Sequence, residues 1–309
     1  MRRIGIIGVD EYLPDRILTN HDLEKLVDTT DEWITTRTGI KERRIASENE
    51  AVSDLAIKAA REALKDAKLD SKDLDLIILA TVTGDMPFPS TASIVQNVLS
   101  AEHAAAFDIS AACAGFVYAL SIAQQFISSG VYKNALVIGA EKLSAVTDFK
   151  DRNTCVLLGD GAGACVVSEV KDGGILSTYL GCDGSNMELL NMPAGGSRMP
   201  ASHETVDSRM HYLKMRGNEL FKIAVKSMTM AAQKVLEQAG LTFRDVDLIV
   251  PHQANSRIIM AVAKKLDGVR DATLFGTTLH VLVDDHLTGE ELLNRIAPGD
   301  TVAACRDVG

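Results

Sequence analysis

The chain has 309 residues, of which 46% are hydrophobic, 24% charged and 5% aromatic. This balance excludes wholesale disorder and a fibrous fold, and the length permits one large or two ordinary domains. The 32 Lys+Arg and 42 Asp+Glu residues give a net charge of −10, which disfavours a general affinity for nucleic acid or anionic membranes. Apolar runs are shorter than the roughly 18 residues that a membrane span needs, and Asp10 and Glu11 interrupt the first one. We therefore expect a cytoplasmic protein that binds neither nucleic acid nor membrane.

Cysteine usage argues against both disulfides and a structural metal. The five cysteines stand at positions 113, 155, 165, 182 and 305. Their number is odd, and the sequence contains no C-x-x-C and no Cys/His pair at zinc-finger spacing. We therefore expect no metal, and the question becomes which cysteine is reactive.

Apolar runs alternate with helical patterns along the first half of the chain. Strands are predicted at 4–9, 76–82, 104–109, 135–140, 155–158 and 162–168, and helices at 51–67, 91–99 and 115–129. The segment Gly159-Asp160-Gly161 is predicted to be a turn, because it does not match a nucleotide-binding glycine loop. This alternation favours an α/β fold in which helices cover mixed sheets.

An internal repeat indicates a duplicated α/β unit. Residues 63–78 and 235–250 align without gaps, and each reads as a helix, a turn and a buried strand. Chance similarity of two such units is the alternative. The repeat predicts an N-terminal half at 1–170 and a C-terminal half at 171–309, with 171–215 as a surface connection.

The second copy is predicted to be short of at least one strand. Only 59 residues follow Val250, whereas about 90 follow the matched strand within the first half. In this remainder we expect a helix at 255–266, a strand near 272–275, a helix at 289–296 and a strand at 301–305.

Cys113 is the first candidate for chemistry. A predicted strand ends at Ile109, small residues follow, and a helix begins at the cysteine. The helix dipole and free amides would stabilise its thiolate, which could attack a carbonyl while N–H groups hold the oxyanion. The alternative is a small buried residue, as free cysteines usually are.

His252 is the second candidate. It follows the apolar run 248–250, and the repeat places it opposite Ala80, just past the carboxyl end of a strand. Ligands bind at that edge of open α/β sheets. A histidine there could activate a thiol or donate a hydrogen bond to a thioester carbonyl. The alternative is a ring held by backbone groups in a helix-capping loop.

A third candidate surrounds Trp33, the only tryptophan. Arg37 and a basic cluster at 41–44 follow it. An aromatic ring with nearby arginines suits a nucleotide-bearing ligand. The alternative, which fits the sequence equally well, is a half-buried tryptophan beside solvated charges with no binding role.

Five segments together carry a family resemblance. They read LPDRILTNHDLEKLVDTTDEWITTRTGIKERRIA, DISAACAGFVYAL, DRNTCVLLGDGAGA, MRGNELFKIAV and PHQANSRII. In order and spacing they resemble the thiolase-like condensing enzymes, specifically β-ketoacyl-acyl-carrier-protein synthase III. The resemblance implies a five-layered αβαβα fold of two duplicated halves and a homodimer. It also implies an acyltransferase that joins acyl-CoA, here expected to be acetyl-CoA, to malonyl-acyl carrier protein (ACP) in fatty-acid initiation, with no cofactor besides these substrates.

The resemblance also assigns roles to individual positions. Cys113 matches the acylated nucleophile, and His252 the histidine that assists decarboxylation. The positions that match the acyl-CoA site are Trp33, Arg37 and Arg152 at the adenine and phosphates, Asn218 along the pantetheine tunnel and Phe88 beside the acyl pocket. The positions that match the ACP docking stretch are Gln253, Ala254, Asn255, Ser256 and Arg257, with Lys264 and Lys265 nearby.

The carboxyl-terminal segment departs from the family pattern. The family's catalytic asparagine corresponds to Thr277 here, and the chain is atypical from about residue 267. Impaired condensation is one expectation. Two alternatives are an acyltransferase that uses Cys113 without decarboxylation, and a catalytically silent scaffold or regulatory partner.

Overall fold

The computed structural model describes residues 2–266, 269–275 and 278–283. Its contacts divide the chain into two compact units, Met1–Ile223 and Ala224–Gly309. The sequence-based halves at 1–170 and 171–309 stay a prediction.

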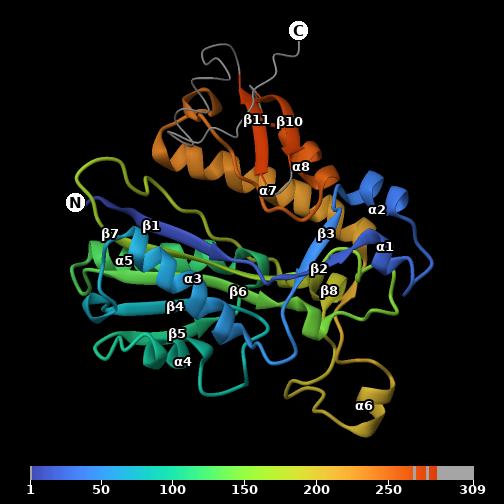
Figure 1. Ribbon diagram of the computed structural model, residues 1–309. Coiled ribbons are helices and arrows are strands. Elements are labelled where there is room, and N and C mark those ends of the chain that lie inside the picture. The colour runs from blue at the N-terminus through green and yellow to red at the C-terminus, as the bar shows by residue number, and fades with distance from the viewer. Residues whose placement is uncertain (1, 267–268, 276–277, 284–309) are drawn as a thin grey trace. The chain divides into compact units, whose positions relative to one another are not determined.

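The first unit is built on a five-stranded mixed sheet (Figure 1). In spatial order its strands are β1 (Ile4–Tyr12), β7 (Asp160–Glu169), β6 (Ala135–Lys142), β4 (Leu76–Ala80) and β5 (Ala105–Ile109). β4 runs parallel to β5 and β6, whereas β7 is antiparallel to β6 and β1. Every residue of β4 is buried, as expected for a continuous apolar run in a strand covered on both faces. The predicted α/β fold with a mixed sheet is confirmed.

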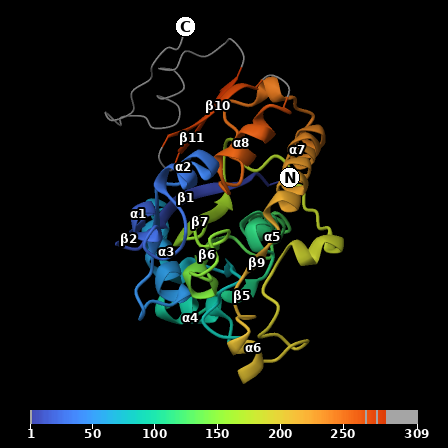
Figure 2. The ribbon, with the colours of Figure 1, turned by 90° about the vertical axis from the view of Figure 1, so that its right-hand side faces the viewer.

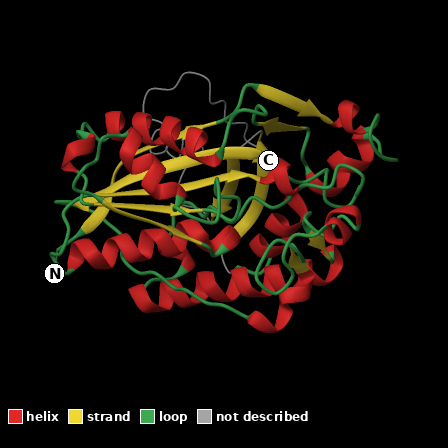
Figure 3. Ribbon diagram, turned by 90° about the horizontal axis from the view of Figure 1, so that it is seen from below, coloured by secondary structure: helices red, strands yellow, loops and turns green. Residues whose placement is uncertain are grey.

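Helices cover both faces of this sheet, as the view from below shows (Figure 3). Ile77 and Leu79 of β4 pack with α3 (Val52–Asp66) and α4 (Thr91–Val98) in one core cluster. Leu76 and Ile78 point the other way and pack with α5 (Gly115–Ser128) in a second cluster. The alternation follows from the two-residue period of a strand.

A smaller layer carries the Trp33 region. β2 (Arg16–Thr19) pairs antiparallel with β3 (Glu42–Ile45), and α1 (Asn20–Leu23) and α2 (Asp31–Thr38) lie between them in sequence. A third apolar cluster holds this layer, and its members are Leu18, Leu23, Ile34, Ile45, Cys155 and Val156.

The segment at 171–215 is mostly exposed, as predicted. It contains the 3-10 helix η4 (Gly184–Leu189), the short pair β8 (Leu190–Asn191) and β9 (Lys214–Met215), and helix α6 (His203–Asp207). Figure 2 shows α6 beyond the edge of the sheet. Arg209 ties this excursion back by donating from Nε to Asp148 Oδ2 at 2.9 Å.

Two predictions in the first unit are wrong. Residues 155–157 form turns and residue 158 has no strand assignment, because the Val156 carbonyl accepts from the Arg43 side chain and the Cys155 amide donates to the Asp151 carbonyl. Asp160 and Gly161 open β7 instead of forming a turn. Lys142 at the end of β6 pairs with Asp160, and the buried Asp160 carboxylate accepts from the Ala46 amide at 2.8 Å.

The repeat is confirmed through its helix and turn. α3 is followed by η1 (Ser71–Asp73), and α7 (Gly217–Ala239) is followed by η5 (Phe243–Asp245) at the same offset of 172 residues.

The strand predicted at the end of the second copy is wrong. Residues 248–250 have no strand assignment, and Val250 is 72% exposed. In the first copy β4 is hydrogen-bonded on both sides, whereas residues 248–250 have no ladder partner within the described chain. An apolar run becomes a strand only where a neighbour accepts its backbone hydrogen bonds.

The remainder of the described second unit is a helix and a hairpin. α8 (Ser256–Ala263) confirms the helix predicted at 255–266. β10 (Val269–Phe275) includes the strand predicted near 272–275, and it pairs antiparallel with β11 (Thr278–Val283). The helix predicted at 289–296 and the strand predicted at 301–305 lie outside the described residues.

Candidate active site

Cys113 lies in a tight turn between β5 and α5. The turn is the 3-10 helix η2 (Ala112–Ala114), and the Cys113 side chain is exposed. Ala112 adopts φ +46°, a left-handed conformation that costs an alanine about 1–3 kcal/mol. Gly115 then begins α5 so close to the sheet that a Cβ atom there would lie 2.9 Å from Ala80 Cβ. The thiol is therefore held at the carboxyl edge of the parallel strands.

Glu141 occupies the same edge and was not foreseen from the sequence. It stands two residues beyond the pairing of β6 with Ala80. Its carboxylate accepts from the Val82 amide at 2.8 Å, from Thr81 Oγ1 at 3.2 Å and from the Thr83 hydroxyl. Burial raises the pKa of Glu141. The available signal was an acidic residue directly after a predicted strand, 135–140.

The surroundings of Cys113 favour the neutral thiol. Desolvation raises the pKa of Cys113, and the negative charge of Glu141 raises it further. The free amides of the first turn of α5 act in the opposite direction. Because the raised pKa keeps the thiol protonated near neutral pH, thiolate chemistry at this position calls for a base.

Two guanidinium groups lie over the Trp33 ring. The carbon at the centre of the Arg37 guanidinium is 5.0 Å from the ring centroid, and that of Arg152 is 4.5 Å away. Arg152 also faces Asp28, with Nη1 3.8 Å from Oδ2. The fold thus brings together three residues of the predicted nucleotide site, although Arg152 is far from Trp33 in the sequence.

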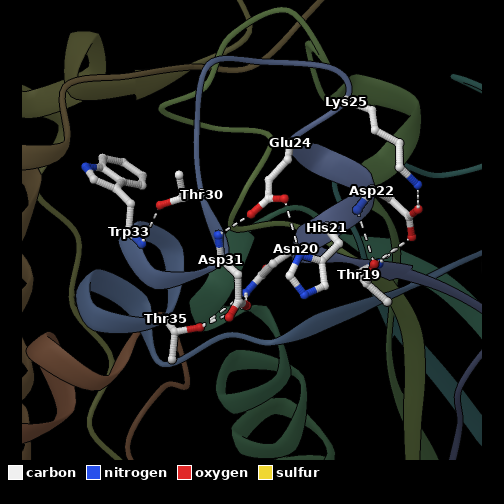
Figure 4. Close-up of polar contacts among 10 residues, drawn as sticks. All are labelled: Thr19, Asn20, His21, Asp22, Glu24, Lys25, Thr30, Asp31, Trp33 and Thr35. Carbon is white, nitrogen blue, oxygen red and sulfur yellow. Dashed lines mark hydrogen bonds and ion pairs between the residues drawn. The ribbon is translucent and has the colours of Figure 1, made fainter.

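The local sequence explains how α2 presents Trp33. Thr30 caps the helix, its Oγ1 accepting from the Trp33 amide at 3.1 Å, and Gly39 ends the helix at φ +77°. These are standard start and stop signals. Figure 4 shows the indole on the far side of α2 from the Thr35 hydroxyl.

The two remaining acyl-CoA candidates are surface residues of the first unit. Phe88 is 84% exposed in the loop between β4 and α4. Asn218 is exposed in the first turn of α7. Among the described contacts, neither touches Cys113.

His252 belongs to the second unit. It is exposed, and it lies between residues 248–250 and the cap of α8. Part of the ring is nevertheless surrounded by protein, and this desolvation lowers the pKa of His252 and favours the neutral imidazole. The pairing of His252 with Cys113 stays a prediction, because the two residues are in different units. Thr277 lies outside the described residues.

The predicted carrier-docking stretch forms the start of α8. Asn255 Oδ1 caps the helix by accepting from the Ile258 amide at 2.9 Å, and Gln253 Nε2 donates to the Pro251 carbonyl at 2.8 Å. Arg257, Lys264 and Lys265 are exposed.

Within the described part of the chain, no three His, Cys, Asp or Glu side chains are grouped as metal ligands. Among the helices of those same residues, none combines the length and apolar character of a membrane span.

The mixed α/β sheet, with a cysteine at the start of a helix beside the ends of the parallel strands, agrees with the thiolase-like condensing enzymes that the sequence resembles. Two family models match this chain. One, described as 3-oxoacyl-[acyl-carrier-protein (ACP)] synthase III, covers residues 107–184, and the model of that family's C-terminal part covers 236–277.

Relatives share most of their length with this chain. The β-ketoacyl-[acyl-carrier-protein] synthase III of Caldanaerobacter subterraneus subsp. tengcongensis is 62% identical over 268 residues, which are 86% of this chain and 81% of the relative. That of Symbiobacterium thermophilum is 51% identical over 308 residues, 98% and 93% of the two chains. The chain therefore belongs to the β-ketoacyl-acyl-carrier-protein synthase III family of condensing acyltransferases.

Solved structures agree with this assignment. The 3-oxoacyl-[acyl-carrier-protein] synthase III of Aquifex aeolicus has a TM-score of 0.78 at 55% identity, covering 85% of this chain and 81% of its own. The enzyme of Thermus thermophilus has a TM-score of 0.79 at 44% identity, with the same coverage of 85% and 81%.

Proposed function

We propose that this protein condenses an acyl-CoA, with acetyl-CoA as the expected primer, with malonyl-ACP to begin fatty-acid synthesis. The observation that carries the proposal is Cys113 in its strained turn at the start of α5, inside the segment matched by the family model. In the first step Cys113 Sγ bonds to the acyl carbon and the CoA thiol leaves. In the second, malonyl-ACP loses carbon dioxide, its enolate attacks the acyl carbon, and the Cys113 thiol is regenerated. Neither step needs a cofactor.

A base is required for the first step, because partial desolvation by the surrounding protein and the charge of Glu141 raise the pKa of the Cys113 thiol. We assign this role and assistance to decarboxylation to His252. Its lowered pKa keeps the imidazole neutral, so that it can accept a proton or donate a hydrogen bond to a thioester carbonyl. The first-turn amides of α5 are suited to hold the oxyanion.

The Trp33 site is proposed to bind the nucleotide end of acyl-CoA. The Arg37 and Arg152 guanidinium groups both lie within 5.0 Å of its ring centroid. An aromatic ring and guanidinium groups can stack with an adenine, and the guanidinium groups can bind phosphates bidentately. Asn218 and Phe88 are assigned to the pantetheine path and the acyl pocket.

The start of α8 is proposed to dock ACP. Arg257, Lys264 and Lys265 are exposed there, and their positive charges would steer an acidic partner in spite of the net charge of −10. Gln253, Ala254, Asn255 and Ser256 complete the stretch, and Asn255 shapes it by capping α8.

A cytoplasmic homodimer is the proposed form of the protein. Among the described strands β5 lies at an edge of the five-stranded sheet, and it begins with the exposed Ala105. A sheet edge can pair with a second copy of the chain. Nucleic acid and membrane remain unexpected partners.

Intact mass spectrometry after exposure to acetyl-CoA tests the first step. We expect one acetyl adduct, lost in Cys113→Ala and kept in Cys182→Ala, which removes the other exposed cysteine of the described residues. Absence of an adduct from the unsubstituted protein would overturn the proposal in favour of a silent scaffold.

Carbon dioxide release from malonyl-ACP tests the second step. Stoichiometric release with a ketoacyl product supports condensation, whereas an acetyl adduct without release would indicate an acyltransferase that does not decarboxylate. The relatives' names support the condensing enzyme and neither alternative. With Thr277 at the family's asparagine position, we propose turnover reduced by about 10²–10³-fold, the usual cost of one lost donor.

A further inference from the structure

Asn20 is a buried amide at the start of α1, only 1% exposed. Its Nδ2 donates to Asp31 Oδ1 at 2.7 Å, to the Ile40 carbonyl at 2.9 Å and to Thr35 Oγ1 at 3.3 Å. Asp31 and Thr35 belong to α2, and Ile40 follows it. Figure 4 shows the amide reaching the Asp31 carboxylate and the Thr35 hydroxyl. One side chain therefore holds both ends of the helix that carries Trp33 and Arg37.

The oxygen of the same amide faces a buried cation. Asn20 Oδ1 accepts from Arg43 Nη1 at 2.6 Å, and Arg43 is only 4% exposed. Arg43 Nε donates to the Val156 carbonyl at 3.0 Å, and its Nη2 binds the same oxygen. A buried guanidinium is retained where its geometry fixes several acceptors at once.

Val156 belongs to the run of turns at 152–157, which begins with Arg152. A chain of hydrogen bonds thus runs from α2 through Asn20 and Arg43 to this run of turns, which supplies Arg152, the second arginine of the Trp33 site. The apolar cluster beneath, in which Ile34 packs near Cys155 and Val156, holds the two segments together but is not directional. Hydrogen bonds fix orientation in a way that apolar contact does not.

We propose that Asn20 is a positioning residue that sets the distance between α2 and the Arg152 turn, and thereby keeps the Arg37 and Arg152 guanidinium groups together over Trp33 for the nucleotide end of acyl-CoA. The inference rests on the acyl-CoA site proposed above. It adds that Asn20 acts on acyl-CoA affinity and not on the chemistry at Cys113.

The sole tryptophan gives a readout that does not depend on activity. Trp33 is the only tryptophan in the chain, so its fluorescence reports this site alone. In Asn20→Ala we expect acrylamide quenching of Trp33 to rise about twofold, because the stacked arginines no longer shield the ring.

Kinetics with two thioesters separate binding from chemistry. For acetyl-CoA we expect the KM of Asn20→Ala to rise about tenfold with kcat within about twofold. For acetyl-N-acetylcysteamine, which lacks the nucleotide, we expect both constants to stay at their original values. The matched control is Asn134→Ala, elsewhere in the first unit. The Asn134 amide likewise uses both its groups: Nδ2 donates to the Asp73 carbonyl at 3.0 Å, and Oδ1 accepts a hydrogen bond from Ser168 Oγ at 2.8 Å. This control should change neither readout.

Asp31→Ala is a second variant that cuts the same connection from the less buried side, and it serves if Asn20→Ala does not fold. Unchanged quenching in both variants, or in the one that folds, would overturn the inference. Increased quenching with an equal KM effect on the two thioesters would instead overturn the assignment of acyl-CoA to the Trp33 site. The failure of the inference and the failure of the proposed site are thus distinguishable.

Discussion

The close approach of α5 to β4 makes Gly115→Ala a test of how Cys113 is placed. The added Cβ would lie 2.9 Å from Ala80 Cβ, where ordinary contact begins at 3.4 Å. The start of α5 or the end of β4 must therefore move by about 0.5 Å, because neither partner is a flexible side chain. Overpacking of this kind costs about 1–3 kcal/mol, and the better helix propensity of alanine returns up to about 1 kcal/mol.

We expect a net loss of about 1–2 kcal/mol of unfolding free energy, which lowers the melting temperature by several degrees. Misplacement by 1 Å can cost about 10²-fold in rate, so the 0.5 Å shift should slow acetylation of Cys113 about tenfold. Calorimetry and time-resolved intact mass spectrometry measure the two effects.

The control is Gly163→Ala in β7, where an added Cβ meets nothing within 4 Å. It should leave stability the same or slightly higher and acetylation unchanged. If Gly115→Ala acetylates at the original rate with an unchanged melting temperature, the argument that glycine positions the nucleophile is wrong.

Three further predictions concern charge and packing in the first unit. Glu141→Gln removes a negative charge that raises the pKa of Cys113. The pH profile of iodoacetamide labelling at Cys113, followed by peptide mass spectrometry, should therefore move to lower pH; an unmoved or upward-shifted midpoint contradicts this. The ion pair and hydrogen bonds with Arg209 lower the pKa of Asp148 from 3.8 to about 2. Above pH 4 this shift contributes about 1–2 kcal/mol to the free energy of unfolding, and the contribution is lost as the pH falls through about 2. Urea unfolding should therefore show Asp148→Asn less stable at pH 7, with the difference shrinking in acid; a constant difference would exclude the carboxylate as its source. Gly8→Ala would place a Cβ 2.4 Å from the Ala67 amide nitrogen, at the end of α3. Urea unfolding should therefore show a loss of about 3 kcal/mol in the free energy of unfolding, and an unchanged free energy would refute that close packing.

Much of this protein follows from short-range patterns. The run Leu76–Ala80 is apolar at every position, which predicts the buried strand that the structure shows, and the small residues around Cys113 predict the tight turn before α5. The repeat even places η1 and η5 at equivalent positions. These features are decided by neighbours within a few residues, which is the range over which the helix and strand periods act.

Other features were decided only by the tertiary structure. Residues 248–250 match the apolar pattern of β4 but form no strand, because a strand depends on partners elsewhere in the chain. Arg152 meets Trp33, and Glu141 meets residues 81–83, across sequence separations that no local pattern spans. Asn20 looks like an ordinary helix-start residue, yet burial makes its amide the link between α2 and Arg43. A polar side chain hydrogen-bonds to whatever the fold buries beside it, so its partners are set by tertiary packing and not by its neighbours in the sequence.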